Sequence, residues 1–159
     1  MQLRAEYDAL RDAGCRILSP LDLDFSEERD DFVYLDHEID QAPAEIERGH
    51  LDAIRSADMV WLHAPTGYLG AGGAFEIGTA HTAGVPVYSS ALIADVGLRQ
   101  FVINVASPGD AVRHRKTMAI HRPGEPLKAL QRYSLCKTFR PSSGVSGLPR
   151  LEGATDLPH

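Results

Sequence analysis

Hydrophobic residues along this chain alternate between helically spaced blocks and short continuous runs. Leu3, Tyr7 and Leu10 recur at helical spacing and predict an amphipathic helix over residues 2–12, with Gly14 as its C-terminal stop. The segment "CRILSP" (15–20) then predicts a short strand that ends at a Ser-Pro pair. The chain therefore opens with a helix followed by a strand.

The same alternation continues through the middle of the chain. Pro43 suits the first turn of a second helix, over residues 43–57. The apolar run "DMVWLHAP" (58–65) predicts a strand that is buried on both faces, as in a parallel sheet. A loop and a helix follow it, and then come a strand in "VPVYSS" (85–90), a short helix in "IADVGLR" (93–99) and a strand in "FVINVAS" (101–107).

Strands that alternate with helices predict an α/β fold, with one parallel sheet covered by helices on both faces, as in Rossmann-like or flavodoxin-like domains. Such a domain begins with a central strand, whereas this sequence begins with a helix. Either that strand lies upstream of Met1 or the domain lacks it, and we favour a truncated start. A sheet without its first strand leaves backbone groups unpaired, so we expect a homodimer or a higher oligomer.

Two segments lack a clear periodic pattern. Residues 21–42 are acidic and form a long connection, with one short strand expected at "DFVYLD". From about Thr138, the chain mixes Pro, Gly and Ser without an apolar period. We therefore expect one domain over residues 1–137 and a disordered or loosely docked tail over 138–159.

Composition excludes several classes of protein. Hydrophobic residues make up 43% and charged residues 24%, which is typical of a globular domain, and the net charge of -6 argues against dedicated nucleic-acid binding. The two cysteines form no disulfide framework, and no His, Cys or Asp spacing predicts a metal site. No signal peptide or membrane-spanning run is visible, so we expect a cytoplasmic location and no membrane partner.

The segment "TGYLGAGGAFEIG" (66–78) carries the candidate chemistry. It follows a predicted parallel strand, and ligands of open parallel sheets bind outside the carboxyl ends of the strands. Glycines let the backbone approach a ligand closely. Glu76 falls near the first turn of a helix that we expect to begin near Gly73, where the helix dipole favours the ionised carboxylate. Acidic residues are also common at ordinary helix starts, so position alone leaves a purely structural role open.

The wider segment "ADMVWLHAPTGYLGAGGAFEIGTAHTAGVPVYS" resembles the nucleoside 2-deoxyribosyltransferase-like family. The resemblance covers about residues 2–105 and is most specific from 50 to 88. The matching pieces are Ala57-Asp58, Gly67-Tyr68, Gly70, Glu76-Ile77-Gly78, Ala80 and Gly84-Val85-Pro86-Val87.

The resemblance implies cleavage or transfer of an N-glycosidic bond, with Glu76 as the nucleophile at C1′ of a deoxyribose, and it implies no cofactor. The implied ligand is a small nucleoside or nucleotide. His50 stands where the family carries an acidic residue that helps to hold sugar or base, and Asp52 follows two residues later. The substrate-binding candidates are Gly67, Tyr68, Gly70, Gly73, His63, His50 and Asp52.

Transferase and hydrolase are not separable from the sequence, because they differ only in whether a base or water completes the turnover. Two further readings stay open. One is a nucleotide-binding or regulatory module without turnover, which the missing first strand and His50 favour. The other is a phosphoribohydrolase of the cytokinin-activating type, because "GAGGAFE" resembles part of that family's glycine-rich loop.

Overall fold

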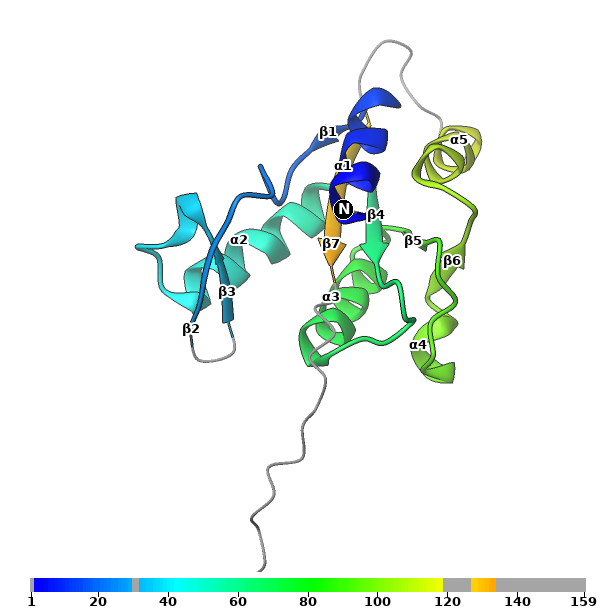
Figure 1. The fold of residues 1–159 in the computed structure, drawn as a ribbon. Helices are drawn as coiled ribbons and strands as arrows, with labels where there is room; N and C mark the ends of the chain where they lie inside the picture. Colours follow the sequence, from blue (N-terminus) through cyan, green and yellow to red (C-terminus); the bar gives the residue numbers. More distant parts are fainter. Residues whose placement is uncertain (1, 30–31, 119–126, 134–159) are drawn as a thin grey trace, which may run out of the picture.

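The computed structural model describes residues 2–29, 32–118 and 127–133. Five strands in these ranges form one parallel sheet in the order β1-β7-β4-β5-β6, and two form a separate antiparallel hairpin, β2-β3 (Figure 1). The strands are β1 (Arg16–Ile17), β2 (Phe25–Arg29), β3 (Phe32–Leu35), β4 (Met59–His63), β5 (Val87–Ser89), β6 (Val102–Asn104) and β7 (Lys128–Tyr133). The predicted α/β fold with a parallel sheet is confirmed.

Helices cover both faces of the sheet, as predicted. The helices are α1 (Gln2–Asp12), α2 (Pro43–Ser56), α3 (Ala71–Thr82), α4 (Val96–Arg99) and α5 (Pro108–Met118), and a 3-10 turn, η1, spans Asp36–Glu38. Helices α1 and α5 contact one another over one face, and α2 and α3 contact one another over the other (Figure 1). In the described ranges, no helix is both long enough and apolar enough to span a membrane.

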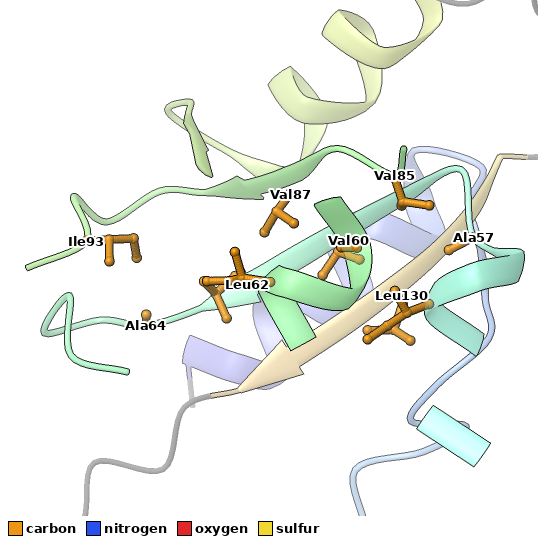
Figure 2. Packing of buried hydrophobic residues seen from close by; sticks show 11 residues of the cluster. Ala57, Val60, Leu62, Ala64, Val85, Val87, Ile93 and Leu130 are labelled. Atoms are coloured by element: carbon orange, nitrogen blue, oxygen red, sulfur yellow. The ribbon is translucent and has the colours of Figure 1, made fainter. Parts of the chain in front are cut away.

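Alternation along the central strands creates two separate hydrophobic cores. Val60 and Leu62 of β4 point toward α2 and α3, where they pack with residues such as Ile54, Ile77 and Leu130 (Figure 2). Met59 and Trp61 lie between them in the sequence and join the core beneath α1 and α5. Burial on both faces explains why β4 reads as a continuous apolar run.

The main difference from the sequence prediction concerns the missing first strand. No described strand precedes α1, but the sheet has no gap, because β7 lies between β1 and β4. It pairs in parallel with both neighbours, from Met59↔Ala129 to His63↔Tyr133 on the β4 side. The expected gap in the sheet is therefore wrong, and the association argument built on that gap loses its basis.

Two other elements differ from the prediction. The acidic connection contains the β2-β3 hairpin where one short strand was expected, and helix α5 was not predicted. The basic cluster at residues 113–116 lies on α5. The expected tail, residues 138–159, lies outside the described residues.

Candidate functional site

A glycine turn closes the carboxyl end of the central strand β4. Gly67 has φ +74°, and a Cβ at this position would lie 2.3 Å from the Leu92 carbonyl oxygen. The Gly67 carbonyl in turn accepts a hydrogen bond from the Ala94 amide at 2.9 Å. Glycine is therefore required here by the packing of the turn against the segment after β5. This is a structural reason that the sequence interpretation, which invoked ligand approach, did not foresee.

Helix α3 begins directly after this turn, with Gly70 as its N-cap. A Cβ added at Gly70 or Gly72 would meet no atom within 4 Å, so space is open beside the helix start, whereas one at Gly73 would lie 3.3 Å from the Leu69 side chain. Tyr68 is half exposed. The predicted loop candidates thus lie together at the carboxyl edge of the sheet.

Glu76 is the sixth residue of α3 and is only 4% exposed. The helix begins at Ala71, two residues before the predicted start near Gly73, so Glu76 lies in the second turn and the first turn has no acidic residue. The helix dipole therefore stabilises the ionised carboxylate of Glu76 only weakly, because the effect of the dipole falls off within the first turn. The Cα–Cβ bonds of a helix tilt toward its N-terminus, so Glu76 leans toward the carboxyl edge from the α2–α3 face.

On the opposite face, a buried carboxylate joins the last residues of β4 to α1. Glu6 is 8% exposed. Its Oε2 accepts a hydrogen bond from Trp61 Nε1 at 2.8 Å and lies 2.8 Å from His63 Nδ1. Gln2 donates a further hydrogen bond to Oε1. His63 was a sequence candidate, whereas Glu6 was missed.

The sequence does contain a signal for Glu6. Leu3, Glu6, Tyr7 and Leu10 form one i, i+3, i+4, i+7 stripe, and the last three are buried. A carboxylate within an apolar stripe must have hydrogen-bond donors nearby, because an unpaired buried charge is costly. The stripe, however, does not indicate which donors these are.

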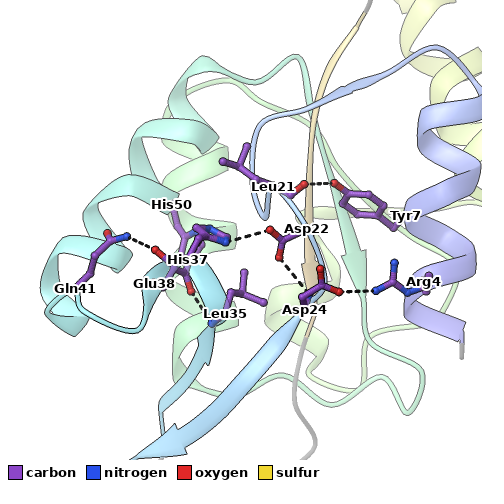
Figure 3. Close-up of polar contacts among 10 residues, drawn as sticks. All are labelled: Arg4, Tyr7, Leu21, Asp22, Asp24, Leu35, His37, Glu38, Gln41 and His50. Atoms are coloured by element: carbon purple, nitrogen blue, oxygen red, sulfur yellow. Dashed lines mark hydrogen bonds and ion pairs between the residues drawn. The ribbon is translucent and has the colours of Figure 1, made fainter.

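His50 belongs to a different polar cluster, next to α2. Its Nδ1 lies 2.5 Å from the hydroxyl of Ser19, and its Nε2 lies 3.8 Å from Glu38 Oε1. Glu38 is buried, and its other oxygen accepts a hydrogen bond from the Leu35 amide. His37 Nε2 also lies 3.8 Å from Glu38 Oε1, and His37 Nδ1 pairs with Asp22, which places the η1 turn against the segment before β2 (Figure 3).

This cluster lines a small cavity of about 190 Å³ between the end of β1, η1 and α2. Asp52 is not among its lining residues. It is exposed on α2 and pairs with Arg55 at 2.8 Å. The structure thus separates two residues that the sequence proposed together. No group of three or more His, Cys, Asp or Glu side chains in the described ranges is arranged to hold a metal ion.

The chain was compared with protein-family models, with curated proteins and with solved structures, and none of the three comparisons gives a match.

Proposed function

We propose that this chain cleaves or transfers the N-glycosidic bond of a nucleoside or nucleotide, with Glu76 as the nucleophile. The observation that carries the proposal is a buried carboxylate on the helix that starts at the carboxyl end of the central strand. That edge is where open parallel sheets bind ligands. The open space beside Gly70 and Gly72 gives a substrate room to approach the helix start.

In the proposed reaction, a carboxylate oxygen of Glu76 forms a bond to C1′ as the bond from C1′ to the base breaks. The base leaves with the electron pair of that bond and takes up a proton. Water or a second base then attacks C1′ and releases the carboxylate. This is the two-step scheme of retaining glycosidases, and it needs no cofactor.

The test uses the purified chain with 2′-deoxynucleosides and their 5′-monophosphates, with and without a second free base. Chromatography measures the bases that are released or exchanged. We expect Glu76→Gln to lower the rate by about three orders of magnitude or more, because the covalent step is lost. Glu45→Gln is the matched control, because Glu45 is an exposed glutamate on α2 and its replacement should leave the rate unchanged.

A nucleotide-binding module without turnover is the second candidate, and the burial of Glu76 favours it, because a closed-off carboxylate reaches C1′ poorly. Binding measured by calorimetry without release of base would support this module and reject the enzyme. The trapping of a covalent sugar adduct on Glu76, seen by mass spectrometry with a 2-fluoro substrate analogue, would reject the module.

The expected homodimer or higher oligomer and the cytoplasmic location stay predictions. Edge strand β6 pairs only with β5 among the described strands, and both Ile103 within it and Phe101 just before it are exposed. An exposed edge of this kind is compatible with association. Light scattering over a dilution series measures the oligomeric state directly.

A further inference from the structure

The last two inward-facing side chains of β4 on the α1 face, Trp61 and His63, share one carboxylate oxygen of Glu6. Both contacts are 2.8 Å long, and the Glu6 and His63 side chains are only 10% and 12% exposed. Of the residues that the structure describes, Glu6 alone makes a polar contact with the His63 ring. This arrangement lies on the face of the sheet opposite to helix α3, which carries Glu76.

From this geometry we infer that His63 carries the proton that the leaving base requires, and that Glu6 is the positioning residue that holds its ring. The inference rests on the proposed function and deepens it. An ionised carboxylate only accepts hydrogen bonds, so the proton between Glu6 and His63 lies on Nδ1. The second ring nitrogen, Nε2, is then the atom that is left to exchange a proton with a ligand.

The position of His63 suits this role. It is the final residue of β4, and the Gly67 turn leads from it to the helix that carries Glu76. His63 contacts Glu6 of α1, whereas Glu76 lies on α3, so the two groups belong to opposite faces of the sheet. A nucleophile and a proton donor that act on one bond need this opposition, because the base departs away from the attacking oxygen.

The proton balance is simple. Protonated His63 gives its Nε2 proton to a ring nitrogen of the base while the C1′–N bond breaks and Glu76 bonds to C1′. Neutral His63 then takes a proton from the attacking water, or from the N–H of an incoming base, as the bond between C1′ and Glu76 breaks. The enzyme returns to its starting state without any further reactant.

The test compares two substrates that differ only in their need for this proton. The base of 2′-deoxyguanosine must be protonated as it leaves, whereas the positively charged base of 7-methyl-2′-deoxyguanosine leaves without a proton. His63→Asn keeps a donor for Glu6 but removes the proton carrier. We expect it to lower the single-turnover rate of base release, which reports only the first step, by about 10²–10³-fold on 2′-deoxyguanosine and by less than about threefold on the methylated substrate.

Glu6→Gln tests the positioning role. We expect a loss of about tenfold that is again confined to 2′-deoxyguanosine, together with a change of the His63 ring tautomer in ¹⁵N NMR spectra, because an amide accepts the Nδ1 proton less well than a carboxylate. Asp22→Asn is the matched control. It alters another carboxylate that contacts a histidine Nδ1, in the cluster next to α2, and should change neither readout.

The outcomes separate the two proposals. Equal losses on both substrates, or no loss on either, would overturn the role of His63 while Glu76 remained the nucleophile. An unchanged tautomer in Glu6→Gln would overturn the positioning role. Full activity of Glu76→Gln, with a selective loss in His63→Asn, would remove only the nucleophile assignment. A wild-type chain that releases base from neither substrate would remove both proposals.

Discussion

The two faces of the sheet are built from different chemistry. Beneath α2 and α3, the core is aliphatic, with Ile54, Val60, Leu62, Ile77 and Leu130 among its members. Beneath α1 and α5, the core holds larger and more polar groups, with the Trp61 and Tyr88 rings and the Cys15 thiol. Trp61 and Tyr88 each have a polar partner, in Glu6 and His114 respectively.

The difference shows how each face contributes to stability and to chemistry. The aliphatic face is stabilised by apolar burial and close packing, neither of which fixes the orientation of a polar group. The polar face fixes the orientation of its side chains through hydrogen bonds, as Glu6 does for the Trp61 and His63 rings. Glu76 is buried on α3, on the aliphatic face. His63 contacts Glu6 on the polar face, so the same sheet supports both side chains.

The largest expected effect on stability comes from the aliphatic face. Ile54 is fully buried, so Ile54→Ala removes apolar contacts and leaves a cavity. We expect the free energy of unfolding to fall by about 3 kcal/mol. Urea unfolding followed by the fluorescence of Trp61, the chain's single tryptophan, measures it.

The matched control for Ile54→Ala is Leu92→Ala, because Leu92 is 61% exposed. Its effect should stay within about 0.5 kcal/mol. A loss below about 1 kcal/mol for Ile54→Ala would mean that the α2–α3 face is not the packed core described above.

The polar face should respond to the loss of one acceptor. Glu6→Ala leaves the buried indole N–H of Trp61 and Nδ1–H of His63 without their partner. We expect a loss of roughly 2–3 kcal/mol, because buried donors without acceptors carry a desolvation cost. Asp22→Ala removes a carboxylate from a partly exposed pair with His37 and should cost less than about 1 kcal/mol. Equal losses of stability in the two variants would show that the burial of Glu6 does not increase the contribution of its hydrogen bonds to stability.

Much of the fold could be predicted because the local patterns of its elements are strong. The apolar run at residues 59–63 and the helical spacing of Leu3, Tyr7 and Leu10 depend only on neighbours in the sequence. Strand β7 could not be found in this way. The segment "KALQRY" is short and half polar, and its partners in β1 and β4 lie more than 60 residues away. The order of strands in the sheet depends on pairing between distant segments, and the local hydrophobic pattern does not predict it.

The residues of the candidate site likewise fall into those that the sequence places close together and one that only the fold brings near. Glu76, His63 and the Gly67 turn are close in the sequence: His63 ends β4, the turn follows it, and Glu76 lies on the helix after the turn. Glu6 is 57 residues from His63, so only the folded chain brings the two together. The start of α3 was misplaced by two residues, since Ala71 and Gly72 were counted with the loop, and this changed the expected electrostatics of Glu76.

A third prediction tests the polar face through pH. Burial raises the pKa of the Cys15 thiol from 9.0 to about 11. Above pH 9 the unfolded chain loses this proton while the folded chain retains it, so stability is present below pH 9 and is lost as the pH rises toward 11. Between pH 8 and 10.5 we expect wild type to lose about 2 kcal/mol more than Cys15→Ala. The readout is the difference in urea unfolding between the two proteins, and parallel pH profiles would contradict the burial of the thiol.

The smallest expected effect concerns Tyr88, which lies fully buried on the polar face. Its hydroxyl lies 3.0 Å from His114 Nδ1, and the two rings meet edge to face. Tyr88→Phe keeps the ring but removes this hydrogen bond, and we expect a loss of about 1 kcal/mol. The loss stays small because His114 is only half-buried, so water can replace the hydroxyl as its partner. A double-mutant cycle with His114→Leu isolates the pair, and in that background Tyr88→Phe should have almost no further effect. A loss of the same size in both backgrounds would show that Tyr88 stabilises the polar face by packing alone, as the side chains of the aliphatic face do.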